Sequence, residues 1–144
     1  MTHFSVLLAS IALAAGIGGQ TGKPQGKPAA AALQGTWIVA SINGEAAPSG
    51  APEMTLTFTG DKYEQAMGGQ VNERGTIKVD ATKKPMAIDL AIGEGSDAGK
   101  TQLGIFEVSG DTMKLHLDTP DAGQRPADFT PKEGSFMVVA KKKP

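Results

Sequence analysis

The sequence predicts an all-β fold, a small antiparallel up-and-down barrel of eight strands. Apolar and polar residues alternate at period two in several runs, for example at Met54, Leu56 and Phe58, which is the pattern of a strand with one buried face. Short turn sequences such as Asn43-Gly44 and Ser109-Gly110-Asp111 separate these runs. A closed barrel is favoured because closure removes the exposed strand edges at which chains aggregate.

The strands are expected to follow one another through short connections, as in an antiparallel meander. Their predicted positions are residues 34–42, 53–59, 62–67, 70–80, 86–92, 101–108, 112–118 and 134–140. In the 101–108 run, Leu103 and Ile105 lie on one face while Phe106 and Val108 lie on the other, so a β-bulge is expected there. From residue 33 to the end, no apolar pattern of helical period extends over three turns.

The residues before the barrel are expected to form an export signal followed by a flexible linker. Residues 1–18 predict a secretory signal peptide, because their apolar run is too short for a stable membrane anchor and is followed by small residues. No Lys or Arg precedes that run, so a buried N-terminal helix is the alternative. Residues 19–32, rich in Gly, Pro and Ala, predict a flexible linker, and residues 33–141 form the barrel domain. The predicted location is therefore extracytoplasmic, either periplasmic or secreted.

The composition narrows the classes of partner. The chain has 144 residues, a net charge of −1 and no cysteine. The near-neutral balance gives no electrostatic reason to expect a nucleic-acid partner. Because cysteine is absent, the chain has neither disulfides nor a lipid-attachment residue after the signal peptide. The barrel must therefore be held together by its apolar core, and no stable membrane anchor is expected after cleavage.

The segment Gly35-Thr36-Trp37 opens the first predicted strand and contains the only tryptophan. At the start of a strand in a small barrel, a large aromatic side chain can plug one end. A glycine two residues earlier lets the backbone pass close beneath the ring. Gly35 and Trp37 are therefore predicted to form the floor of the barrel.

Several ordered stretches carry a resemblance to a known family. They include Leu33-Gln34-Gly35-Thr36-Trp37, Phe58-Thr59-Gly60-Asp61, Gly75-Thr76-Ile77-Lys78-Val79-Asp80 and Ser109-Gly110-Asp111. In these the chain resembles a family of small exported lipocalin-like domains of unknown function from planctomycete bacteria. The resemblance covers about residues 33–141 and implies a lipocalin-like barrel in an exported protein. It implies no reaction, substrate or binding residue.

More distantly, Gly35-x-Trp37 is similar to the first signature of true lipocalins. In those proteins an Arg from a late strand packs over the Trp and closes the barrel floor. The resemblance makes Arg125 a candidate for this role, since Arg stacks well on indole. The alternative is an exposed loop arginine, because Arg125 precedes Pro126 in an expected loop.

Few residues offer catalytic or metal-binding chemistry. His116 is the only histidine after the predicted signal peptide, and it is expected to be solvated on the outward face of its strand. One histidine without cysteine does not make a zinc site. The Gly93–Thr101 segment lacks the glycine spacing of a phosphate-binding loop. We therefore expect no metal, no cofactor and no enzymatic activity. The weaker alternative is a carboxylate-based hydrolase, if Asp89, Asp111 and Asp128 meet in space.

The apolar strand faces suggest a ligand site in the barrel. Methionines on these faces suit a pocket that adapts to varied apolar guests, although filling an irregular core explains them more simply. Our leading hypothesis is a non-enzymatic module that binds a small apolar or amphipathic molecule in one barrel mouth. The alternative is a filled barrel that serves as an interaction or scaffold module of the cell envelope. The residues predicted to line the site are Met54, Leu56, Phe58, Ile88, Leu90, Met113 and Leu115.

Overall fold

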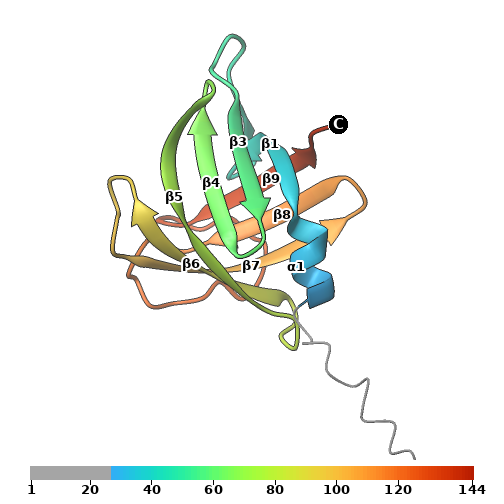
Figure 1. Ribbon diagram of the computed structural model, residues 1–144, viewed down its shortest axis with the longest axis vertical. Coiled ribbons are helices and arrows are strands. Elements are labelled where there is room, and N and C mark those ends of the chain that lie inside the picture. Colours follow the sequence, from blue (N-terminus) through green and yellow to red (C-terminus); the bar gives the residue numbers. More distant parts are fainter. Residues whose placement is uncertain (1–26) are drawn as a thin grey trace, which may run out of the picture.

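The computed structural model describes residues 27–144, whose strands form one closed barrel (Figure 1). Apart from the two-residue β2, each strand pairs antiparallel with the next, and β1 also pairs with β9, which closes the sheet. The elements are α1 (Lys27–Leu33), β1 (Gly35–Ile42), β2 (Glu45–Ala46), β3 (Met54–Thr59), β4 (Lys62–Met67), β5 (Gln70–Asp80), β6 (Met86–Glu94), β7 (Thr101–Ser109), β8 (Thr112–Leu117) and β9 (Phe136–Lys142). Eight strands form the wall, so the predicted fold is confirmed.

The predicted limits of the strands agree with the structure to within two residues, but the expected bulge is wrong. β7 pairs in continuous register with both β6 and β8. The register shifts lie elsewhere, at Val39/Ser41 between β1 and β9, at Gln65/Ala66 between β4 and β5, and at Arg74/Gly75 between β5 and β6. Apolar residues on both faces of β7 have another cause: its outward face is covered by a long connection, described below.

α1 occupies the end of the segment that the sequence predicts to be a linker. Its sequence is mostly alanine, the residue with the highest helix propensity, and its last residue, Leu33, is completely buried. Within residues 27–144 no helix is long and apolar enough to cross a membrane. The predicted signal peptide (1–18) and the first part of the predicted linker lie outside the described residues.

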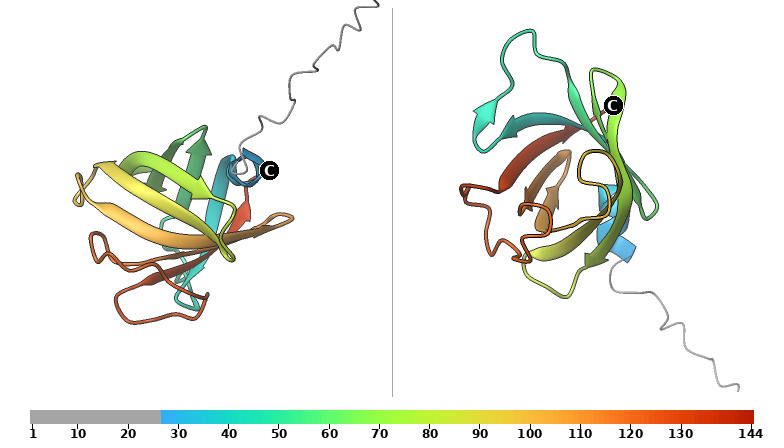
Figure 2. Two further views of the ribbon diagram at one scale, coloured as in Figure 1. Left: turned by 90° about the horizontal axis from the view of Figure 1, so that it is seen from below. Right: turned by 90° about the vertical axis from the view of Figure 1, so that its left-hand side faces the viewer.

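The two ends of the barrel differ because consecutive strands run in opposite directions. One end, here called the floor, carries α1, the turns at 60–61, 81–85 and 110–111, and the end of β9. The other end, here called the mouth, carries the connections 43–53, 68–69, 95–100 and 118–135 (Figure 2).

Trp37 closes the floor, as predicted. Its side chain is only 1% exposed, and its indole N–H donates to the carbonyl of Leu33, 2.7 Å away, at the end of α1. The ammonium of Lys142 lies 4.8 Å from the centre of the indole ring, in a cation–π contact. Gly35 has a φ of +105°, and a side chain there would meet Lys142. This position therefore requires glycine.

The inward faces of the strands form one hydrophobic core against this floor. Its aromatic members are Trp37, Phe58, Tyr63 and Phe106, with Leu33 added from α1. The aliphatic members come from alternating positions of the strands, as period-two patterning requires: Leu56, Ile77, Ile88, Leu90, Met113, Leu115, Leu117, Val138 and Ala140. This core closes the floor of the barrel, whereas the mouth is hollow.

Candidate functional site: a cavity in the barrel mouth

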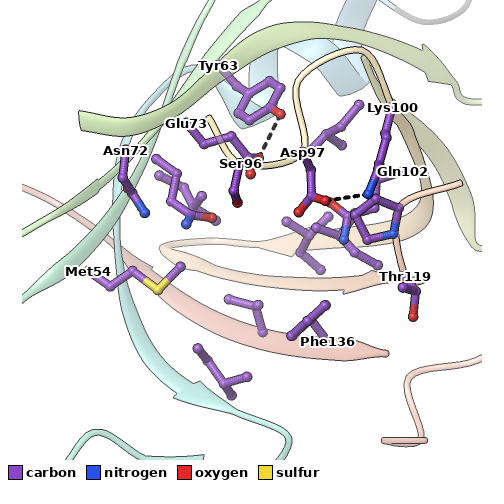
Figure 3. Close-up of a pocket in the computed structure, with 18 of the residues that line it drawn as sticks. Met54, Tyr63, Asn72, Glu73, Ser96, Asp97, Lys100, Gln102, Thr119 and Phe136 are labelled. Atoms are coloured by element: carbon purple, nitrogen blue, oxygen red, sulfur yellow. Dashed lines mark hydrogen bonds and ion pairs between the residues drawn. The ribbon is translucent and has the colours of Figure 1, made fainter. Parts of the chain in front are cut away.

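A cavity of about 580 Å³ opens at the mouth (Figure 3). Its wall is made by inward-facing residues of the strands, and its rim by residues of the connections 95–100 and 118–135. Pockets that hold small organic ligands have volumes of about 300–1,000 Å³. The barrel is therefore not filled by its own side chains, and the space at its mouth is large enough for one small molecule.

Part of the cavity wall is apolar. Met54 and Leu56 on β3, Leu90 on β6 and Leu115 on β8 line it. These are four of the residues that the sequence predicts to line a ligand site. The other three, Phe58, Ile88 and Met113, do not line it, because they lie nearer the floor on the same strands. Alternation identifies which face of a strand points inward, but it does not show how far along the barrel the core extends.

Another part of the cavity wall is polar. In Figure 3, Tyr63, Glu73, Ser96, Asp97 and Gln102 lie along one side, whereas Met54 and Phe136 lie across from them. These polar residues were not predicted from the sequence. The strand pattern did contain a signal for it. Tyr63 and Gln65 on β4 alternate with outward residues, and Gln102 on β7 shares the inward face of Phe106. Polar residues therefore occupy inward positions near the mouth.

Tyr63 and Glu73 form a partly buried hydrogen bond inside the barrel. The Tyr63 hydroxyl donates to Oε1 of Glu73 over 2.8 Å. Burial, together with the hydrogen bond and the negative charge of Glu73, raises the pKa of Tyr63 far above its usual value. The hydroxyl therefore stays protonated at neutral pH and holds the Glu73 carboxylate in place.

Two further polar contacts organise this part of the wall. The side-chain amide of Gln102, only 6% exposed, donates to the carbonyl of Asp118 over 2.7 Å. At the rim, the ammonium of Lys100 lies 2.9 Å from Oδ1 of Asp97. This ion pair raises the pKa of Lys100. The first contact ties β7 to the connection 118–135, and the second lies within the connection 95–100.

Large apolar side chains are also exposed at the mouth. Met67, Val71 and Phe136 are the large hydrophobic residues exposed in the part of the chain that the structure describes, and each is 40–45% exposed. Met67 and Phe136 line the cavity. An apolar entrance of this kind is typical of a ligand-binding site.

The predicted role of Arg125 is wrong. Its guanidinium donates to the carbonyls of Ile88 (3.1 Å) and Gly104 (2.7 Å) and to the carboxylate of Asp89 (2.6 Å). These contacts attach residues 118–135, here called the outer loop, to the outer wall at β6 and β7. Lys142, on the last strand, takes the position over Trp37 instead.

His116 faces outward as expected, but it is completely buried rather than solvated. Nδ1 lies 2.6 Å from the carbonyl oxygen of Asp128, and Nε2 lies 2.8 Å from Oγ of Ser135. Both partners belong to the outer loop, which folds back over β8. The sequence could not show this cover, because the loop has no regular pattern that indicates where it packs.

The described residues do not assemble the carboxylate site considered as an alternative. Asp89 pairs with Arg125, and the carboxylate of Asp128 accepts from the backbone N–H of Thr130. Asp111 contacts Thr112 in a turn. Ser135 and His116 make a contact like that of a nucleophile and its base, but both are buried and neither lines the mouth cavity. Among the described residues, no three His, Asp or Glu side chains are placed to hold a metal ion.

The floor closed by Trp37, the eight-stranded wall and the open mouth with its cavity fit a lipocalin-like barrel. This likeness is one of architecture. Comparisons of the chain with family models, curated proteins and solved structures found no match.

Proposed function

We propose that this protein binds a small amphipathic molecule in the mouth of its barrel. The observation that carries the proposal is the cavity of about 580 Å³, whose wall combines apolar side chains such as Leu56, Leu90 and Leu115 with the polar side chains of Tyr63 and Glu73. An amphipathic guest would bury its apolar part against the leucines, at about 25 cal/mol per Å² removed from water. Its head group would face the polar side chains.

Two features support binding by a largely preformed site. Tyr63 and Glu73 are already fixed to each other, so little ordering is required when a head group arrives. Met54 and Met67 at the entrance have flexible side chains that adapt to guests of different shape. We propose further that the protein is exported and acts outside the cytoplasm, as its N-terminal sequence and its resemblance to exported lipocalin-like domains predict.

A fluorescence titration tests the proposal. N-phenylnaphthylamine, a neutral apolar probe, is expected to bind with increased emission and to be displaced by decanol. Leu90→Trp should fill part of the cavity and weaken probe binding at least tenfold. The matched control is Ala91→Trp, because Ala91 is the next residue of β6 and its side chain is exposed outside the barrel.

The control should bind the probe as the unmodified protein does. Absence of probe binding by the folded, unmodified protein would contradict the proposed function. Equal loss in the two variants would show that the probe binds somewhere other than the mouth cavity.

A further inference from the structure

We infer that the head group of the bound molecule is a protonated amine and that Glu73 receives it. This inference rests on the proposed function, because it specifies the class of ligand for the same cavity. It is drawn from the hydrogen bonds and the charges of the polar side chains in the cavity wall.

Glu73 is a carboxylate that has no cationic partner among the described residues. The ion pairs in this part of the chain join Arg74 to Glu64 and Glu94, Lys100 to Asp97, and Arg125 to Asp89. The Tyr63 hydroxyl satisfies one oxygen of Glu73, namely Oε1. The second oxygen, Oε2, accepts no hydrogen bond from any described residue, so it can receive a donor from a guest.

The charged residues that line the cavity are Glu73, Asp97 and Lys100, which leave one net negative charge. Since Lys100 already neutralises Asp97 at the rim, the uncompensated charge is that of Glu73. Burying an apolar guest beside it would further desolvate this carboxylate, which is costly unless a cation pairs with it. A guest carboxylate would add repulsion, whereas an ammonium would neutralise the charge.

Gln102, a second polar residue of the cavity wall, also offers an acceptor. Gln102 uses its amide NH₂ as a donor to Asp118, which leaves its Oε1 without a partner among the described residues. An ammonium has three donors and no acceptor. Its hydrogen-bonding capacity therefore suits the free oxygen of Glu73, with Gln102 as a further acceptor in the same cavity, while an attached alkyl chain would lie against apolar lining residues such as Leu56 and Leu115.

Three probes with the same ten-carbon chain separate the head groups: decylamine, decanol and decanoate, each below its aggregation concentration at neutral pH. We expect decylamine to bind the unmodified protein about tenfold more tightly than decanol, as one charge-assisted hydrogen bond provides. Decanoate should bind most weakly. Isothermal titration calorimetry gives the three dissociation constants.

The Glu73→Gln variant tests the assigned residue. It should weaken decylamine binding about tenfold, to the level of decanol, and change decanol binding less than about threefold. The matched control is Glu107→Gln, which removes the same charge from an exposed outward position on β7 and should keep the preference for the amine. If Glu73→Gln does not fold, the ranking of the three probes on the unmodified protein decides.

The outcomes distinguish the inference from the proposed function. If decanol binds but decylamine binds no more tightly, or if decanoate binds best, the inference is overturned and the proposed function stands. If the amine preference survives in Glu73→Gln, the assignment of Glu73 is overturned. If none of the three probes binds, the proposed function itself fails.

Discussion

At the scale of single residues, the floor depends on a glycine and a tryptophan of the first strand and on a lysine of the last strand. Gly35 adopts a φ of +105°, and a Cβ atom there would lie 2.9 Å from Nζ of Lys142. The absence of a side chain lets Lys142 reach the indole of Trp37 and the carbonyl of Gln34. Trp37 also ties α1 to the barrel through Leu33. One aromatic side chain thus joins the first helix, the first strand and the last strand.

Replacing Trp37 therefore tests the floor. We expect Trp37→Ala to lower the free energy of unfolding by about 3–5 kcal/mol, the range for truncation of a buried large aromatic side chain. The variant also leaves the Leu33 carbonyl without its donor. Because Trp37 is the only tryptophan, urea unfolding should be followed by circular dichroism. A loss below about 1 kcal/mol would show that Trp37 does not close the floor.

At the scale of elements, the outer loop holds the barrel wall from outside. Arg125 of this loop binds backbone carbonyls of β6 and β7. His116 of β8 contacts the loop twice, at the carbonyl of Asp128 and at the hydroxyl of Ser135. The loop also sets part of the cavity rim through Thr119 and Pro120. An irregular segment therefore contributes both to stability and to the shape of the mouth.

Arg125 of this loop is expected to contribute more to the free energy of unfolding than an exposed arginine does. Arg125→Met leaves the carbonyls of Ile88 and Gly104 without this donor and should lower the free energy of unfolding by about 1–3 kcal/mol. The control Arg74→Met, which removes only exposed ion pairs, should lower it clearly less, because exposed ion pairs contribute little to stability. Urea unfolding measures both. Equal costs would mean that Arg125 does not anchor the loop.

The strands were predictable from the sequence, but the packing outside them was not. Period-two runs and turn residues locate the strands because both signals are local. The cover over Ile105 and His116 comes from a loop that is close to them only in space, so the sequence indicates a bulge and a solvated histidine instead. Lys142 on Trp37 is likewise a contact between the two ends of the barrel domain. No local pattern distinguishes it from Arg125.

The candidate site was predictable in part for a related reason. Leu56 and Phe58 share the inward face of β3 and both belong to the core, yet only Leu56 lines the cavity, because Phe58 lies nearer the floor. Depth along the barrel depends on the register between strands, which alternation does not give. Glu73 was not predicted because its role in the site depends on Tyr63, which comes within hydrogen-bonding distance of it only once β4 and β5 pair.

At the scale of the whole molecule, an eight-stranded barrel encloses just enough space either to be filled by side chains or to hold one small ligand. This barrel does both along its length. Aromatic and aliphatic residues fill the floor around Trp37 and Phe106, and the mouth retains a cavity of about 580 Å³. The packed floor therefore stabilises the barrel, while the cavity at the mouth has room for a ligand.

The methionines allow this division to be tested directly. Met54 and Met67 line the mouth cavity, Met113 lies in the core, and Met137 lies opposite His116 on the outer face. In a protein with isotope-labelled methionine methyl groups, NMR spectra recorded during a decanol titration report these positions separately. We predict that the methyl signals of Met54 and Met67 shift to saturation while that of Met137 stays in place. Unshifted Met54 and Met67 signals at saturating decanol, or a shift confined to Met137, would contradict binding in the barrel mouth.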